Sequence, residues 1–88
     1  MKISFSDEAW EDYQHWINTD PKMLIRLNKL IEECRRTPFR GMGKPEPLRD
    51  NLKGWWSRRI TTDDRLVYRV KGKDEDQVLE IIQCRMHY

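Results

Sequence analysis

The chain has 88 residues, 36% of them charged, with four tryptophans, three tyrosines, two phenylalanines and a formal net charge of +2 at pH 7. This length gives room for one domain, residues 1–88, and the aromatic residues supply a modest core, which excludes a disordered tail. With two cysteines and no apolar run of membrane-spanning length, we expect a cytoplasmic protein with reduced thiols and without a disulfide framework, zinc site or membrane segment.

The first 36 residues predict a short strand followed by two helices. Ile3 and Phe5 alternate with polar residues, which predicts the strand. Ser6 is a capping residue for the first helix, and Asp20, followed by a proline, is a start signal for the second. The apolar stripes at helical spacing are Ala9, Trp10, Tyr13, Trp16 and Ile17, then Met23, Leu24, Leu27, Leu30, Ile31 and Cys34.

Residues 37–54 hold three of the four prolines and three of the four glycines, and they predict a long loop. The segments WWSRRIT, RLVYRV and QVLEIIQCRMHY then predict three strands, joined by short turns at TTDD and KGKDEDQ. This order predicts an α+β fold, in which a short N-terminal strand precedes two helices packed on one face of a small antiparallel sheet.

Alternation assigns the strand residues to two faces of this sheet. One face should pack on the helices, and the other would present arginines and a histidine to solvent as a phosphate-binding surface. In the middle strand we expect Leu66, Tyr68 and Val70 opposite Arg65, Val67 and Arg69. In the last strand we expect Leu79, Ile81, Gln83, Arg85 and His87 opposite Val78, Ile82, Cys84 and Met86.

Basic side chains are concentrated in the middle of the chain. Residues 35–73 carry twelve basic and four acidic side chains, a balance of +8, whereas residues 1–34 and 74–88 each balance at −3. This segregation indicates a local site for a polyanion, and the alternative is a solvated charged surface.

Glu46 stands between two prolines in the loop, so its carboxylate is held with little backbone freedom. It is either an ion-pair partner or a poised base, and the residues alone favour the ion pair. A carboxylate, arginines, a histidine and a tyrosine without a metal-ligand cluster suit metal-free RNA cleavage. That reaction needs a base for the 2′-OH, cations for the phosphorane and an acid for the leaving 5′-oxygen, and no cofactor.

The motifs RRTPF, GKPEPL, WWSRRIT, RLVY and the terminal HY occur in this order in a chain of this size. Together they resemble the YoeB (Txe) toxins of bacterial toxin–antitoxin systems, in the RelE superfamily, over essentially the whole chain. The departures are Met86, where some members have an aromatic residue, and a longer turn at KGKDED.

The resemblance implies an mRNA interferase that enters the ribosomal A site and cleaves the codon there. By this resemblance, Glu46 stands at the position of the family's general base, and His87 stands at the position of its general acid. Arg65 would stabilise the phosphorane, and Tyr88 would orient the scissile nucleotide or the histidine. Auxiliary phosphate contacts are implied for Arg59 and Lys44.

The resemblance also implies partners. A cognate antitoxin of the YefM type would cover the site with its C-terminal segment, and the complex would repress its own operon through antitoxin contacts with operator DNA. The sequence also leaves open whether the chain forms a homodimer. Three alternatives are a ParE-like toxin that binds DNA gyrase without catalysis, a ribosome-independent RNase, and a purely structural domain.

Overall fold

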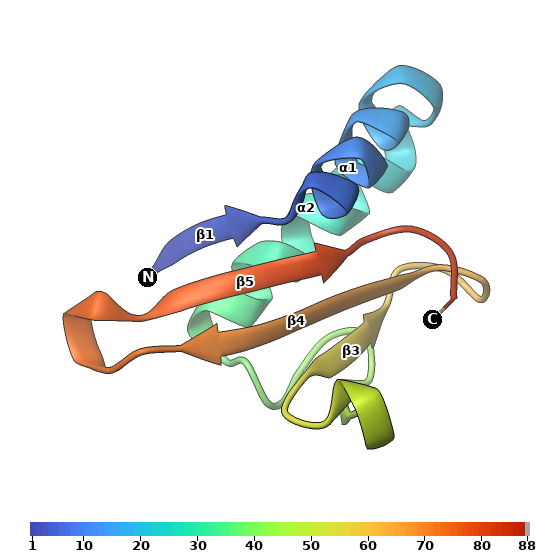
Figure 1. Cartoon of the computed structure of the whole chain (residues 1–88). Coiled ribbons are helices and arrows are strands. Elements are labelled where there is room, and N and C mark those ends of the chain that lie inside the picture. The colour runs from blue at the N-terminus through green and yellow to red at the C-terminus, as the bar shows by residue number, and fades with distance from the viewer. Residues whose placement is uncertain (88) are drawn as a thin grey trace.

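A five-stranded sheet in the order β1-β5-β4-β3-β2 forms one layer of the molecule, and two helices cover one of its faces (Figure 1). The computed structural model describes residues 1–87, so the predicted role of Tyr88 lies outside the described residues. The helices are α1 (Asp7–Thr19) and α2 (Pro21–Arg36). The strands are β1 (Lys2–Phe5), β2 (Glu46–Pro47), β3 (Trp56–Arg59), β4 (Arg65–Lys71) and β5 (Val78–Gln83), with short 3₁₀ turns at Asp50–Leu52 and Asp74–Asp76.

Both predicted helix starts are confirmed. The Ser6 hydroxyl accepts a hydrogen bond from the Ala9 amide at 3.1 Å, and the Asp20 carboxylate accepts one from the Met23 amide at 3.2 Å. Each bond satisfies an amide that the first helical turn leaves without an intrahelical partner. Neither helix within residues 1–87 is long and apolar enough to cross a membrane.

The α+β fold class is confirmed, with one difference in the sheet. β1 lies at the edge and runs parallel to β5, with Lys2 opposite Val78, whereas the other neighbouring strands are antiparallel. The core between sheet and helices includes both cysteines, which are free and fully buried as expected. Its other members are Ala9, Trp16, Leu27, Leu30, Ile31, Ile60, Leu66, Tyr68, Leu79 and Ile81.

The predicted face assignment of the last strand was wrong beyond Ile81. The register between β4 and β5 shifts, so that Tyr68 pairs with Ile81 while the adjacent Val67 pairs with Gln83. Such a bulge adds one residue to β5 and reverses the alternation after it. Gln83 therefore moves to the face away from the helices, while Cys84 is buried in the core with Ile81. The strand ends at Gln83 instead of running to the C-terminus.

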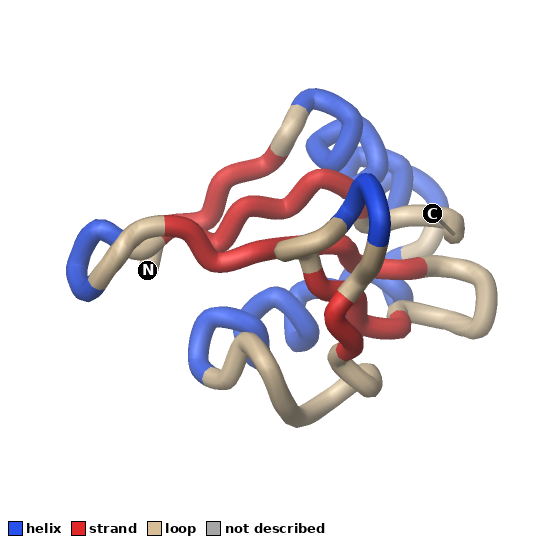
Figure 2. Tube along the Cα trace, turned by 60° about the horizontal axis from the view of Figure 1, so that its bottom comes forward, coloured by secondary structure: helices blue, strands red, loops and turns tan. Residues whose placement is uncertain are grey.

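Within residues 37–54 the predicted loop contains the short strand β2; strands are red and loops tan in Figure 2. A buried arginine organises the part of the loop before β2. Arg58 is 0% exposed and donates hydrogen bonds to the Tyr68 hydroxyl and to the carbonyls of Thr37, Arg40 and Met42. These bonds join the loop to β3 just before the chain reaches Glu46.

Candidate active site

A row of paired residues crosses the sheet on the face away from the helices. Glu46 pairs with Ser57, Ser57 with Val67, and Val67 with Gln83. Residues paired in this way direct their side chains to the same face, and adjacent strands are about 4.8 Å apart. The row therefore places the predicted base, Glu46, on the same face of the sheet as Ser57 and Val67, which are themselves buried.

Arg59 and Arg65 form the next pair on this face, because each lies two residues along its strand from the row that contains Glu46. The spacing of alternate residues along a strand is roughly 7 Å. The Arg59 side chain is exposed and makes no ion pair within residues 1–87. The predicted phosphate-binding arginines are thus neighbours of each other and of Glu46.

Arg65 is only 9% exposed, and its guanidinium is partly committed to the protein. Nη1 donates hydrogen bonds to the carbonyls of Thr61, Thr62 and Asp64, at 2.9, 3.0 and 3.0 Å. Nε and Nη2 have no such partner among the described residues, yet neither atom is sealed from solvent. The guanidinium is therefore fixed at one corner, while the edge that carries Nε and Nη2 has no hydrogen-bond partner within residues 1–87.

Arg69, also predicted on this face, is not available to a ligand. Its Nε lies 2.5 Å from a Glu80 carboxylate oxygen, and its guanidinium stacks 4.3 Å from the centroid of the Trp55 ring. Since both its charge and its planar face have partners, Arg69 stabilises the sheet and does not extend the open cationic surface.

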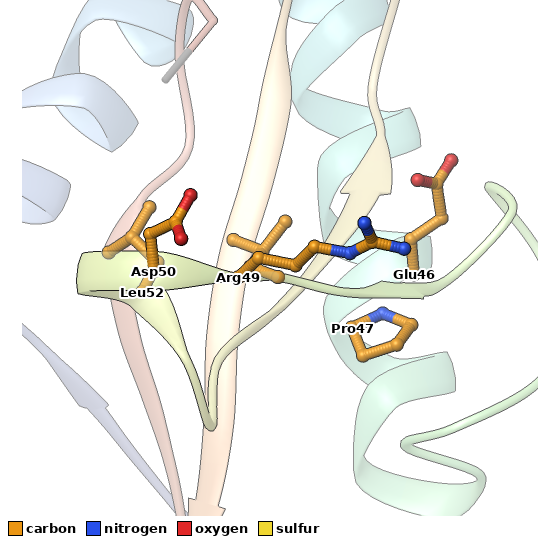
Figure 3. A pocket seen from close by; sticks show the side chains of 6 residues that line it. Glu46, Pro47, Arg49, Asp50 and Leu52 are labelled. Carbon is orange, nitrogen blue, oxygen red and sulfur yellow. The ribbon is translucent and has the colours of Figure 1, made fainter.

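Glu46 lines an open hollow of about 610 Å³ together with the segment that follows it (Figure 3). Its carboxylate is exposed and takes part in none of the ion pairs within residues 1–87, so the ion-pair interpretation was wrong for the part of the chain that the structure describes. The Arg49 side chain extends along the segment toward Glu46. Sequence analysis missed Arg49, although a basic residue just after the rigid EP pair was the available signal.

The C-terminal tail is held against α1 instead of fraying. The Cys84 amide donates to the Asp12 carboxylate at 3.0 Å, and the Trp16 indole donates to the Cys84 carbonyl at 2.7 Å. Burial raises the pKa of Asp12, although the bond from Cys84 acts in the opposite direction. Two residues later, the Met86 carbonyl accepts a bond of 2.9 Å from the Arg65 amide.

His87 follows directly, so the tail brings it to the end of the sheet where Arg65 lies. It is exposed and lines a second hollow, of about 460 Å³, together with tail residues and acidic residues of α1. Glu46 and His87 therefore line separate hollows. Lys44 is exposed two residues before Glu46, after Gly43, whose carbonyl accepts a bond from the Arg59 amide at 2.7 Å.

Comparison with known proteins assigns the chain to a family. Residues 5–88 match the family described as YoeB-like toxin of bacterial type II toxin-antitoxin system. Toxin YoeB of Escherichia coli strain K12 is 52% identical over 88 residues, which cover 100% of both chains. The sequence resemblance is confirmed by this match along the whole length.

Solved structures agree. The YoeB/ParE toxin from Agrobacterium tumefaciens has a TM-score of 0.98 and 51% identity, covering 100% of both chains. A YoeB–YefM heterotetrameric toxin–antitoxin complex from Staphylococcus aureus contains a chain with a TM-score of 0.86 and 40% identity, covering 100% of this chain and 98% of that one. This chain belongs to the YoeB-like toxins of bacterial type II toxin–antitoxin systems.

Proposed function

We propose that this toxin is a ribosome-dependent endoribonuclease, a single domain of residues 1–88 that cleaves mRNA in the ribosomal A site and so stops translation. The observation that carries the proposal is one sheet face that combines an exposed carboxylate without an ion pair in residues 1–87 with a pair of arginines. A tail that carries a histidine is hydrogen-bonded to the backbone of one of these arginines.

Glu46 is the proposed general base. It removes the proton from the ribose 2′-OH, and the 2′-oxygen then forms a bond to the adjacent phosphorus. The flanking prolines limit the motion of this carboxylate, which keeps it ready for a substrate hydroxyl. General-base catalysis of this kind contributes about 10²–10⁴-fold in rate.

Arg65 is the proposed stabiliser of the phosphorane. Its Nε and Nη2 edge offers two parallel donors to two phosphate oxygens, while Nη1 fixes the direction of the guanidinium. Arg59 and Lys44 are proposed as auxiliary phosphate contacts because both are exposed, Arg59 is paired with Arg65, and Lys44 follows Gly43, whose carbonyl is bonded to the Arg59 amide. Arg49 adds a further positive charge at the hollow of Glu46.

His87 is the proposed general acid. It donates a proton to the 5′-oxygen as the P–O5′ bond breaks, which leaves a 2′,3′-cyclic phosphate on one fragment and a 5′-hydroxyl on the other. Tyr88, which lies outside the described residues, is proposed to orient the scissile nucleotide or His87. Glu46 and His87 line different hollows, and a substrate that reaches both is proposed to cross the pair formed by Arg59 and Arg65.

We also propose a cognate YefM-like antitoxin, since the Staphylococcus aureus relative is solved in complex with YefM. An acidic, partly disordered antitoxin segment would complement the +8 charge of residues 35–73. The complex would contact operator DNA through the antitoxin and repress its own operon. A homodimer is proposed as well, since another Staphylococcus aureus relative is a YoeB dimer.

The test is to add the purified chain to a defined mRNA with and without ribosomes, and to map the cut sites and the chemistry of the ends. Cuts that need the ribosome and leave 5′-hydroxyl ends support the proposal. Equal cutting of free RNA would identify a ribosome-independent RNase. Absence of cutting with inhibition of DNA gyrase would identify a ParE-like toxin.

Metal dependence is tested in the same system. The two proton transfers and the arginine charge account for the reaction, so we expect EDTA to leave the chemical step intact once ribosome integrity is maintained separately with magnesium. Fragments with 5′-phosphate ends would contradict this mechanism.

A further inference from the structure

The tail turns sharply at Met86, directly before the histidine. Met86 has a φ of 63°, in the left-handed region that a side chain other than glycine rarely adopts. This conformation costs roughly 1–2 kcal/mol relative to the right-handed alternatives. The side chain of Met86 is 55% exposed, so burial of this side chain does not account for the turn. Hydrogen bonds to the backbone groups of Met86 therefore hold the turn.

Both backbone polar groups of Met86 are bonded to the start of β4. The amide donates to Oδ1 of Asp64 at 2.6 Å, and the carbonyl accepts from the Arg65 amide at 2.9 Å. A second side chain holds the same stretch, because Nε2 of the Gln83 side-chain amide donates hydrogen bonds to the carbonyls of Arg85 and Met86 at 3.0 and 3.1 Å. The turn at Met86 is therefore defined by contacts from the sheet.

Asp64 is oriented for this contact by the β3–β4 turn. Its Oδ2 accepts a hydrogen bond from the Thr61 hydroxyl at 2.7 Å, and the same hydroxyl accepts from the amides of Asp63 and Asp64 at 3.1 Å. One oxygen of the carboxylate is thus anchored within the turn while the other faces the tail. Hydrogen bonds to a carboxylate are roughly twice as strong as those between neutral groups.

We propose that Asp64 is a positioning residue for His87: it holds the left-handed turn at Met86 and thereby sets where the histidine stands relative to Arg65. This inference rests on the proposed function, in which His87 is the general acid. The β3–β4 turn then holds both groups, because its carbonyls fix Nη1 of Arg65 while the Asp64 carboxylate fixes the tail. The acid and the phosphate-binding cation are located by the same few residues.

The test compares Asp64→Ala with Asp64→Asn. Alanine removes the acceptor for the Met86 amide, whereas asparagine retains an oxygen in the same place. Asp63→Ala is the matched control, since Asp63 lies in the same turn, carries the same charge, and makes no side-chain hydrogen bond within residues 1–87. Two properties are measured: the ¹⁵N heteronuclear NOE of the amides at residues 85–87, and single-turnover mRNA cleavage on ribosomes.

We expect Asp64→Ala to lower the NOE values of residues 86 and 87 and to reduce the maximal single-turnover rate constant by roughly 10- to 100-fold, without raising the concentration that gives half of that rate. Asp64→Asn should recover most of the NOE and most of the rate, and Asp63→Ala should match the wild type in both. If Asp64→Ala is too unstable to assay, Gln83→Ala, which weakens the same turn from the other side, should show a smaller change of the same kind.

An ordered tail in Asp64→Ala would overturn the inference. A disordered tail with wild-type cleavage would also overturn it, and His87→Gln then separates the two proposals. If His87→Gln is inactive while Asp64→Ala is active, only the positioning role of Asp64 fails. If His87→Gln is fully active, the proposed function of His87 fails as well.

Discussion

At the scale of single residues, the conformation of Glu46 is determined by its immediate neighbours. Prolines on both sides restrict the backbone, and pairing with Ser57 at the edge of the sheet gives the side chain a defined face. The exposed carboxylate makes no ion pair within residues 1–87, which is compatible with its proposed role as the general base.

Glu46→Gln is predicted to reduce single-turnover cleavage by about 10²–10⁴-fold while ribosome binding is retained, because the amide cannot accept the 2′-OH proton. The matched control is Asp50→Asn, which removes a second carboxylate from the same hollow. Asparagine tolerates the left-handed φ of 54° at that position. Wild-type cleavage by Glu46→Gln would contradict the assignment.

Arg65 is bonded to the β3–β4 turn and is proposed to bind the phosphorane, and Arg65→Lys is predicted to separate the two roles. A single ammonium can replace Nη1 in its contacts with the turn carbonyls, but it cannot also present two parallel donors to a phosphate. We therefore expect a melting temperature close to that of the wild type and a cleavage rate that is only partly retained. Arg65→Ala should lose both stability and rate, and an Arg65→Lys variant with full activity would count against the bidentate contact.

The two thiols are predicted to be inert in the folded protein. Burial raises the pKa of Cys34 to about 11 and that of Cys84 to about 12, from an ordinary value of 9.0. Neither thiol should react with DTNB at pH 8 until guanidinium unfolds the chain. Since the folded pKa values are raised, this contribution to stability is complete below pH 9 and is lost as the pH rises through about 11. Rapid labelling of the native protein by DTNB would disprove the prediction that the two thiols are inert.

At the scale of elements, the loop before β2 depends on a charged residue in the interior. Arg58 donates to three loop carbonyls and to the Tyr68 hydroxyl, which itself donates to the Pro38 carbonyl at 2.5 Å. Gly43, with a φ of +83°, fits closely here because a Cβ at this position would lie 2.8 Å from a Leu30 methyl group. The loop is thus attached to both β3 and α2 before it presents Glu46.

Arg58→Met is predicted to lower the free energy of unfolding by at least about 3 kcal/mol, since it removes four hydrogen bonds donated by a charged group, each worth about 1.5–3 kcal/mol. Arg59→Met, the exposed neighbour, should change it by less than about 0.5 kcal/mol. Urea denaturation of both variants measures the difference. Equal stabilities would mean that the loop does not depend on the buried guanidinium.

At the scale of the whole molecule, the two ends of the chain have different surroundings. β1 pairs with the beginning of β5 at Val78, whereas the tail leaves the other end of β5 after Gln83 and lies beside Arg65. β5, from Val78 to Gln83, separates these ends by roughly 17 Å, since its six residues span five steps of about 3.3 Å. Only the C-terminal end adjoins the proposed active site.

A bulky C-terminal tag is therefore predicted to reduce cleavage far more than the same tag at the N-terminus. The reason is steric, because chain added after residue 88 would occupy the side from which a large ribosomal substrate approaches. The measurement is translation inhibition by both tagged forms, with thermal melting to show that both are folded. Equal inhibition by the two forms would contradict a catalytic role for the C-terminal end.

The sequence by itself determined the elements whose causes are local. Ser6 and Asp20 cap helices through bonds to residues three positions away, and alternation predicted β4 because successive strand residues face opposite sides. The family, and the side chains proposed for catalysis, could also be identified from the order of short motifs. Each of these features depends on neighbours along the chain.

Tertiary structure alone decided how those side chains are held. The bulge between β4 and β5 reversed the predicted faces after Ile81, and it depends on register between strands that are distant in sequence. Alternation separates Arg58 from Arg59 by face, but it does not predict that Arg58 is fully buried or that Arg65, on the same face as Arg59, is partly committed to a turn. Burial and hydrogen-bond partners arise from packing between distant segments, and no periodicity within one strand contains that information.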